Sequence, residues 1–337
     1  MKSLVCTQPH QFSYEDAPQP VQKQGEVLLK VTHVGICGTD LHAFEGTQPY
    51  FSYPRILGHE LSAIIEDPGG TKDFFRGEQV TVIPYFYCGK CIACRKEKTN
   101  CCTSINVFGV HSDGALREWI SVPEYALVKS GGLTGEQLAM IEPLAIGAHG
   151  IRRAGVMEEE YVLVVGAGPI GLGTMAFAKM AGAKVIAMDI SDWRLAFAQQ
   201  VCEVDEVINP QQENAFDHLQ DITHGDMPDV VIDATGNAGA INQAFSFLSH
   251  GGRYILIGLQ KADISFSHPE FHKREATLMS SRNATRADFE QVITSILTKK
   301  IDPLRFITHR VPFSQVKHEF SSLLEPENNL IKAMVIM

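Results

Sequence analysis

Four cysteines stand close together in the first third of the chain, and their spacing, CxxCxxCx₇C, is typical of a metal site. They are Cys88, Cys91, Cys94 and Cys102. Four thiolates so close in sequence can close a tetrahedron around zinc, which leaves no open position for catalysis. Disulfides and an iron–sulfur cluster are the alternatives. Cys101 competes for the fourth position, which we assign to Cys102. The run therefore predicts a structural zinc.

A second group of side chains that can bind metal is spread more widely along the chain. It begins with Cys37 in the segment Gly35–His42 and continues with His59 and Glu60. It is completed by Glu142, which precedes a proline. Thiolate, imidazole and carboxylate groups are all zinc ligands in proteins. This second group is therefore a candidate catalytic centre.

A glycine-rich turn follows the apolar run Tyr161–Val165 and precedes a helix-like segment rich in Ala and Met. It reads Gly166-Ala167-Gly168-Pro169-Ile170-Gly171. The first glycine permits a tight turn, the second lets a pyrophosphate approach the backbone, and the third allows close packing of helix on strand. The helix N-terminus then receives the phosphate charge. The segment predicts a dinucleotide-binding loop, with an unspecialised glycine-rich turn as the alternative.

Asp189 supports the dinucleotide prediction, because it ends the next apolar run, 18 residues after Gly171. A carboxylate there accepts hydrogen bonds from the adenosine ribose hydroxyls and repels a 2′-phosphate, which favours NAD over NADP. A helix cap or a solvated acid is the alternative. Further cofactor contacts are expected beside this acid and at the ends of later strands, from Arg194, Thr235, Gly258, Ser281 and Arg282.

Two kinds of fold are needed to position these groups. Residues 1–147 contain short β-type runs, such as Val27–Val31 and Gln79–Ile83, separated by Gly and Pro. From about residue 160, short apolar strands alternate with helix-length amphipathic segments, which indicates a parallel sheet with crossover helices. The six expected strands are Tyr161–Val165, Lys184–Met188, Asp205–Ile208, Asp229–Asp233, Arg253–Ile257 and Thr277–Ser281.

The remaining tail is expected to return to the first domain. It contains two amphipathic segments, near residues 285–299 and 314–324, and a final apolar strand near Ile331–Ile336. The sequence thus predicts an α/β protein with a β-rich catalytic domain over residues 1–147, a doubly wound six-stranded Rossmann domain over 148–283, and a return segment over 284–337 that completes the catalytic domain.

Composition excludes several other classes of protein. The 337 residues carry a formal net charge of −10, which disfavours binding to nucleic acid or to an anionic membrane surface. The N-terminus lacks a secretory pattern, and no apolar run approaches the length of a membrane span. Five of the eight cysteines crowd between residues 88 and 102 with metal-type spacing. We therefore expect a protein of the reducing cytoplasm.

The cysteine run, the Gly166 loop and the segments around Cys37, His59 and Glu142 occur in the order that resembles the zinc-containing medium-chain dehydrogenase/reductase family of alcohol dehydrogenases. The resemblance covers essentially the whole chain. It is strongest toward the sorbitol, threonine and sugar-acid dehydrogenase branch, because Glu142 occupies the place of a third cysteine in ethanol-oxidising relatives. It implies a GroES-like catalytic domain, two zinc ions per chain, NAD, and a homodimer or homotetramer.

The resemblance also implies roles for individual residues. Cys37 and His59 become ligands of the catalytic zinc, and Glu60 and Glu142 complete the shell directly or through water, with the direct ligand left open. Such a centre keeps one exchangeable position, and the metal lowers the pKa of a substrate alcohol there. The same comparison makes the side chains near Cys37 a proton path, in which Thr39 holds the substrate hydroxyl and His42 passes the proton outward.

The expected substrate is a small polyhydroxylated alcohol, oxidised at a secondary position to a ketone. A glutamate in place of sulfur suits vicinal hydroxyls, and a sugar acid such as L-galactonate or L-gulonate, oxidised at C5, is favoured. Arg282 is expected to pair with the substrate carboxylate, unless it binds the cofactor pyrophosphate. The alternatives are an L-threonine 3-dehydrogenase, a simple alcohol dehydrogenase, a zinc-free reductase of the same fold, and an NAD-sensing or scaffold protein.

Overall fold

The two ends of the chain fold together. In the computed structural model, which describes residues 1–48 and 51–337, one unit comprises Met1–Pro143 and Ala284–Met337, and a second comprises Leu144–Asn283. The sequence placed the first boundary after residue 147, whereas the units divide after Pro143, inside helix α4 (Ile141–Ala154). Because this boundary lies inside a helix and not at a turn, turn signals in the sequence could not locate it.

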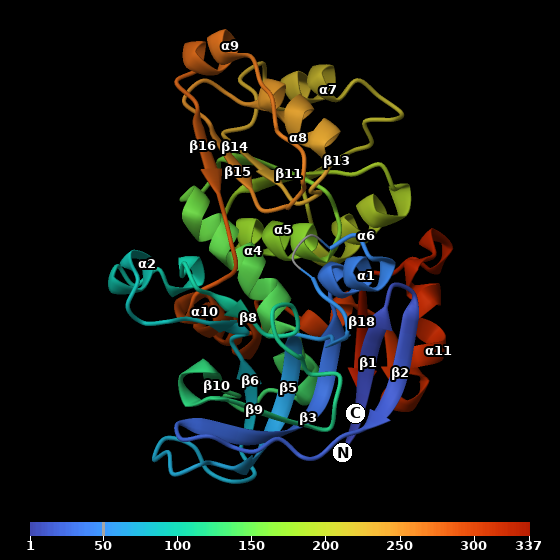
Figure 1. Cartoon of the computed structure of the whole chain (residues 1–337). Coiled ribbons are helices and arrows are strands. Elements are labelled where there is room, and N and C mark those ends of the chain that lie inside the picture. The colour runs from blue at the N-terminus through green and yellow to red at the C-terminus, as the bar shows by residue number, and fades with distance from the viewer. Residues whose placement is uncertain (49–50) are drawn as a thin grey trace. The chain divides into compact units, whose positions relative to one another are not determined.

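The first unit is built on a seven-stranded sheet, with the order β10-β6-β5-β3-β18-β17 and β9 paired to β3. Two smaller sheets, β2-β1-β4 and β7-β8, complete its strands (Figure 1). The strand bounds are β1 Lys2–Gln8, β2 Gln11–Asp16, β3 Glu26–Ile36, β4 Arg55–Ile56, β5 Glu60–Asp67, β6 Gln79–Val82, β7 Tyr85–Phe86, β8 Asn106–Val107, β9 Trp119–Pro123, β10 Leu127–Lys129, β17 Ile307–Pro312 and β18 Lys332–Ile336.

Alternation along β3 shows why this region folds as a half-buried sheet. Val27, Leu29 and Val31 are buried, whereas Lys30 between them is exposed. Successive side chains of a strand point to opposite faces, so this sequence places one apolar row in the core. The central position of β3 lets it pair with β5, β9 and β18.

The register at the end of β3 positions the candidate catalytic centre. Gly35 pairs with Glu60, the first residue of β5, and Ile36 pairs with Ala333, the second residue of β18. Cys37 follows β3 directly, and His59 precedes β5. Because β5, β3 and β18 are neighbours in one sheet, residues from three distant parts of the sequence meet where these strands begin or end.

Short helices flank the strands of the first unit. They are α1 Gly38–Glu45, α2 Ile92–Arg95, α3 Gly135–Ala139, α10 Arg286–Leu297 and α11 Val316–Glu319. Helix α10 agrees with the expected helix near residues 285–299. The single helix expected over residues 314–324 is wrong, because α11 is followed by a 3₁₀ segment, Phe320–Leu324. Phe320 and Leu323 are both buried, and their spacing of three residues matches the 3₁₀ period.

The second unit is a doubly wound α/β domain. Its six parallel strands have the order β13-β12-β11-β14-β15-β16. Figure 1 shows α5 and α6 on one face of this sheet and α7 and α8 on the other. The strands are β11 Tyr161–Val165, β12 Lys184–Met188, β13 Glu206–Ile208, β14 Val230–Asp233, β15 Arg253–Leu256 and β16 Thr277–Ser280. The helices are α5 Pro169–Met180, α6 Asp192–Cys202, α7 Ala215–Ile222, α8 Ala238–Ala244 and α9 His268–Lys273, with most of α4.

The predicted fold class and the existence of all six strands are confirmed. The central strand β11 is buried along Val162–Val165, as expected when helices cover both faces of a parallel sheet. The crossovers after β11 and β14 leave toward opposite faces, so the loop after β11 lies at the switch point where such sheets bind ligands.

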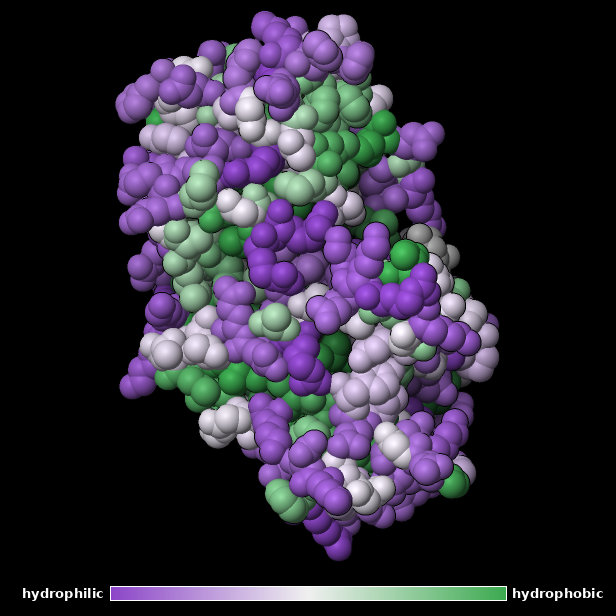
Figure 2. All heavy atoms as spheres, turned by 90° about the vertical axis from the view of Figure 1, so that its left-hand side faces the viewer, coloured by the Kyte–Doolittle hydropathy of each residue, from purple (hydrophilic) through white to green (hydrophobic). Residues whose placement is uncertain are grey.

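No helix among residues 1–48 and 51–337 is long and apolar enough to span a membrane. On the face drawn in Figure 2, hydrophilic residues predominate and hydrophobic residues form smaller groups between them.

Candidate functional site

Asp40 fixes the turn that carries Cys37. Cys37 is the N-cap of α1, and its backbone N–H donates to Asp40 Oδ2 at 2.9 Å. The backbone N–H of Gly58 donates to Asp40 Oδ1 at 3.1 Å, so one carboxylate joins α1 to the turn before β5. The side chain is fully buried, and burial raises the pKa of Asp40. Asp40 thereby holds the backbone on both sides of the candidate centre.

His59 is buried beside this carboxylate. Its Nδ1 lies 3.8 Å from Asp40 Oδ1 and has no hydrogen-bond partner among the described residues. Burial alone would lower the pKa of His59, but the negative charges of Asp40 and Cys37 outweigh it and raise the pKa. A buried ring nitrogen without a partner needs an explanation, and a metal ion is one. Cys37, His59 and Glu60 offer ligand atoms that all lie within 4.8 Å of one another. His59 and Glu60 are buried, and Cys37 is half-buried. We call these three residues the buried donor group, and their sulfur, nitrogen and oxygen atoms suit zinc.

Glu60 is held in place from two sides. Lys332 Nζ donates to Glu60 Oε1 and Oε2, both at 2.6 Å, and to the carbonyl of Ile36 at 3.1 Å. A Cβ on Gly35 would stand 2.2 Å from Glu60 Oε2, so the strand opposite must carry a glycine there. Both charged side chains are buried. The sequence did not single out Lys332, because nothing near it in the chain marks it as part of a site.

Glu142 lies in the first turn of α4 and is also buried. The hydroxyl of Tyr85 donates a hydrogen bond to its Oε1. Burial raises the pKa of Glu142, and the neighbouring charge of Glu60 acts in the same direction. The ligand atoms of Cys37, His59 and Glu60 lie within 4.8 Å of one another, and Glu142 does not belong to this group. The geometry of the described residues therefore favours Glu60 as the direct carboxylate ligand.

The two residues expected to move a proton lie on α1. Thr39 is half-buried, and His42 is exposed. His42 Nδ1 lies 3.3 Å from Glu45 Oε2 and 3.4 Å from Thr47 Oγ1. The structure therefore does not place His42 in the buried donor group, and its exposure is compatible with exchange of a proton with water.

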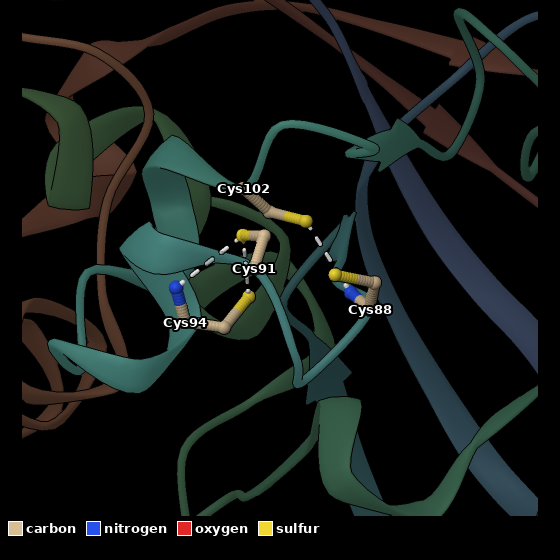
Figure 3. A group of neighbouring side chains, drawn as sticks. All are labelled: Cys88, Cys91, Cys94 and Cys102. Atoms are coloured by element: carbon tan, nitrogen blue, oxygen red, sulfur yellow. Dashed lines mark hydrogen bonds between the residues drawn. The ribbon is translucent and has the colours of Figure 1, made fainter.

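The four cysteines expected to bind the structural zinc come together in the first unit. The ligand atoms of Cys88, Cys91, Cys94 and Cys102 lie within 4.8 Å of one another, and Figure 3 shows their sulfur atoms facing a common space. We call this group the cysteine lobe. Backbone N–H groups of Cys94 and Thr103 lower the pKa of Cys91 to about 5. Cys101 is exposed and lies outside the group. Four converging sulfurs fit a closed zinc site.

The glycine-rich loop of the second unit has the geometry expected of a phosphate cradle. Gly166 has φ +99°, a conformation that favours glycine, and a Cβ on Gly171 would stand 1.8 Å from the carbonyl oxygen of Gly166. Pro169 is the first residue of α5, and Ile170 follows it. A Cβ added to Gly168 would lie 3.8 Å from Arg194 Nη1, its nearest neighbour among the described residues. This side of the loop is therefore open to a ligand.

Asp189 closes this loop. Its Oδ2 accepts a hydrogen bond from the N–H of Ala167 at 2.7 Å, and its Oδ1 accepts one from Ser191 at 2.9 Å. The acid therefore joins the glycine turn after β11 to the start of α6. The cradle and its acid fit a dinucleotide whose pyrophosphate lies at the N-terminus of α5.

The other expected cofactor residues follow β14, β15 and β16. Asp233 at the end of β14 accepts hydrogen bonds from Thr235 Oγ1 at 2.5 Å and from the N–H of Gly236 at 3.2 Å. Gly258 packs so closely that a Cβ would stand 2.2 Å from the nitrogen of Gly236. Ser281 Oγ is buried without a hydrogen-bond partner among the described residues, and Arg282 follows it.

Family models match both units. The alcohol dehydrogenase GroES-like domain matches residues 23–132, and the zinc-binding dehydrogenase domain matches residues 169–298. The L-galactonate-5-dehydrogenase of Escherichia coli K12 is 42% identical over 99% of this chain and 98% of its own. The sorbitol dehydrogenase of Halalkalibacterium halodurans is 31% identical over 94% of each chain.

Solved structures share the fold. An alcohol dehydrogenase from Escherichia coli CFT073, crystallised with the cofactor NADH, superposes with a TM-score of 0.94. It is 32% identical to this chain, and the alignment covers 100% of this chain and 99% of the other. The likeness therefore extends over both units.

Proposed function

The chain belongs to the zinc-type alcohol dehydrogenase family, with zinc and NAD as its cofactors, and we propose that it oxidises a secondary alcohol of a sugar acid. The observation that carries the proposal is the buried donor group of Cys37, His59 and Glu60, which has Glu142 beside it in place of a further sulfur. Oxygen ligands give a more polar centre, which suits a substrate with several hydroxyls.

Each residue of the centre has a distinct task in this proposal. Cys37, His59 and Glu60 hold zinc, which when bound lowers the pKa of a substrate hydroxyl. The hydroxyl of Thr39 accepts the substrate proton in a hydrogen bond and orients the reacting oxygen. His42, exposed on the same helix, passes the proton to water. The second unit would hold the nicotinamide dinucleotide, which would supply the acceptor for the hydride of the substrate carbon.

NAD is the proposed cofactor in preference to NADP. Asp189 lies at the end of β12, where its carboxylate is fixed by Ala167 and Ser191. A carboxylate in this place accepts hydrogen bonds from ribose hydroxyls, whereas it repels the 2′-phosphate of NADP. We propose that Arg194, Thr235, Gly258 and Ser281 line the rest of the cofactor path.

L-Galactonate and L-gulonate, oxidised at C5, are the proposed substrates. The relative that is 42% identical over nearly the full chain is an L-galactonate-5-dehydrogenase. A polyol is the second candidate, because a sorbitol dehydrogenase is 31% identical over 94% of the chain. We further propose that Arg282 pairs with the carboxylate of the sugar acid, since a guanidinium binds a carboxylate through two parallel hydrogen bonds.

A substrate panel tests this proposal. The purified enzyme is supplied with NAD and with L-galactonate, L-gulonate, sorbitol, L-threonine or ethanol, and formation of NADH is followed by absorbance. We expect kcat/KM for an aldonate to exceed that for the polyol of the same stereochemistry by about tenfold or more, which is the worth of one charge-assisted pair. A higher kcat/KM for sorbitol or threonine would overturn the sugar-acid proposal.

We also propose that the enzyme is a homodimer or homotetramer in the reducing cytoplasm. Strand β16 lies at one end of the six-stranded sheet and pairs only with β15 among the described strands, so its other edge can pair with a second copy. All eight cysteines lie among the described residues and none forms a disulfide, which suits a reducing compartment. Sedimentation equilibrium tests the oligomer, and a monomer at micromolar concentration would refute it.

A further inference from the structure

A groove in the first unit has no part in the zinc and cofactor chemistry described above. It is formed by helix α10, strand β10 and the loop between β5 and β6, and its volume is about 820 Å³, within the range of small-molecule sites. No proposed metal, cofactor or substrate residue is among the described residues that line it. Figure 1 shows α10 and β10 on the side that faces the viewer in Figure 2, where hydrophobic residues form a band between hydrophilic ones. We call it the α10 groove.

The floor of the α10 groove is apolar. It is formed by four buried side chains, those of Phe74, Leu127, Val128 and Ile293. Tyr125 also lines the groove and is 41% exposed, so a second aromatic residue stands beside this floor. Apolar and aromatic linings bind ligands through the area that they remove from water. The floor therefore suits a ligand with a hydrocarbon or aromatic body.

Negative charge without a partner lines the α10 groove. The carboxylates of Asp73 and Glu290 have no hydrogen bond or ion pair among the described residues. Arg286 also lines the groove, but its guanidinium is held by two backbone carbonyls. Its Nη2 donates to the oxygen of Tyr125 at 2.5 Å and to that of Leu127 at 3.1 Å. The groove thus offers two carboxylates to a positively charged ligand.

An ammonium group of the protein itself already lies in the α10 groove. Lys129 ends β10 and is exposed, and its Nζ lies 5.3 Å from the centroid of the Phe74 ring. The ammonium has no hydrogen bond or ion pair among residues 1–48 and 51–337. The face of the ring is therefore its contact, and aromatic faces attract cations. Because an exposed lysine gains side-chain entropy when it is released, a ligand can displace it at little cost.

We propose that the α10 groove binds a small organic ammonium compound. Its apolar body covers the floor, and its positive charge lies over the ring of Phe74, near Asp73 and Glu290, in the place that the Lys129 ammonium occupies. The ring face and the carboxylates attract a cation and disfavour an anion. The proposal does not depend on zinc, on NAD or on which alcohol is oxidised, so a wrong substrate assignment would leave it unaffected.

Three probes that share a phenyl ring and differ in charge test the proposal. They are benzyltrimethylammonium, the neutral 3-phenylpropionamide and the anion 3-phenylpropionate. The quaternary ammonium has no lone pair and cannot bind zinc, and saturating NADH keeps the probes out of the cofactor site. Binding to the zinc-loaded enzyme is measured by saturation-transfer NMR. We expect the Kd of the cation to lie about tenfold below that of the amide, from one cation–π contact and two exposed charge pairs, and the anion to bind most weakly. Equal affinity for the three probes would overturn the proposal.

Lys129→Thr removes the internal competitor and keeps a residue that suits a strand. We expect the Kd of benzyltrimethylammonium to fall by about threefold, because the ring face of Phe74 is then free for the ligand. Lys30→Thr is the matched control. Lys30 lies on β3 outside the groove, and its Nζ lies 5.8 Å from the centroid of the Trp119 ring, so the same contact and the same charge are lost elsewhere. Weaker binding by Lys129→Thr, or an equal gain in both variants, would contradict the proposal.

The acidic residues should act in the opposite direction. We expect Asp73→Asn and Glu290→Gln each to raise the Kd of the cation by about threefold, and the double variant to raise it by about tenfold. Glu15→Gln, at an exposed position of β2 outside the groove, changes the net charge equally and should leave the Kd unchanged. Native kcat in every variant would show that the fold is intact. An unchanged Kd in the double variant would refute the proposal, as would tighter binding on dilution of the protein, which would show that a second copy covers the groove.

Discussion

The cysteine lobe and the buried donor group are two candidate zinc sites within one folding unit, and they are assembled in opposite ways. The lobe takes all its ligands from residues 88–102, and every ligand is a sulfur. The donor group combines Cys37 after β3 with His59 and Glu60 at the start of β5, and Lys332 from the far end of the chain supports it. Four sulfurs from one segment can close around a metal, whereas the three donors that come together across strands leave one position of a tetrahedron open. The difference matches the roles of a structural and a catalytic zinc.

The largest expected effect is on the dispersed site. Cys37→Ala or His59→Ala removes one of the ligands that activate the substrate hydroxyl, a contribution of several kcal/mol to the barrier. We therefore expect kcat/KM to fall by about a thousandfold or more, with the fold retained. Metal analysis should show zinc falling from about two ions per chain to about one. If the native enzyme contains a single zinc ion per chain, the comparison between two sites fails.

The second prediction concerns the cysteine lobe, where we expect stability to fall and activity to be retained. Cys91→Ala opens a closed thiolate site whose metal binding contributes to folding, so the melting temperature should fall by about 10 °C or more. The folded fraction should keep most of its kcat, because the buried donor group is unchanged. Cys101→Ala is the matched control, as Cys101 is exposed and lies outside the ligand group. Equal destabilisation by both substitutions would show that the lobe does not bind metal through the four assigned sulfurs.

The contrast between local and dispersed sites also explains how much the sequence could predict. Strands β11 and β12 have the predicted bounds, Tyr161–Val165 and Lys184–Met188, because apolar runs beside glycines are strong local signals. The four lobe cysteines are likewise marked by their own spacing. Such patterns need no knowledge of which strands become neighbours.

Lys332 and Tyr85 were not predicted, for the complementary reason. Each contacts a glutamate that is distant in sequence, Glu60 in one case and Glu142 in the other, and only strand pairing brings them together. The one available signal was a lysine at the start of an otherwise apolar final strand, Lys332–Ile336. The sequence also left open which glutamate binds zinc, because that depends on distances to Cys37 that no motif contains.

The third prediction has a smaller expected effect and concerns the cofactor loop. Asp189, at the end of β12, holds the glycine-rich turn after β11. Asp189→Asn keeps an oxygen that can accept a hydrogen bond from Ala167 or Ser191 but removes the negative charge. We expect kcat/KM with NAD to fall by about tenfold, and the penalty against NADP to be relieved by a similar factor. Asp189→Ala should show both changes and a lower melting temperature, because the loop then loses its closing hydrogen bonds. A native enzyme that prefers NADP would refute the role of Asp189.

The smallest expected effect concerns Arg282. The residues next to it in the sequence do not indicate which ligand it binds. It follows Ser281, whose buried hydroxyl has no hydrogen-bond partner among the described residues, so the segment is suited to receive a ligand. The ligand that we propose for Arg282 is the substrate carboxylate or, as the alternative, the cofactor pyrophosphate, since both are anions that a guanidinium binds through two hydrogen bonds.

Kinetics on a matched pair of substrates distinguish these two roles. If Arg282 binds the carboxylate, Arg282→Ala should lower kcat/KM for the aldonate by about tenfold, which corresponds to one charge-assisted hydrogen bond, and leave the polyol of the same stereochemistry nearly unchanged. Arg282→Lys should recover only part of the loss, because an ammonium group keeps the charge but not the planar fork. Equal losses on both substrates, together with a higher KM for NAD, would assign Arg282 to the cofactor. Substrate preference would then arise at the metal centre, from the buried donor group and from Glu142 beside it.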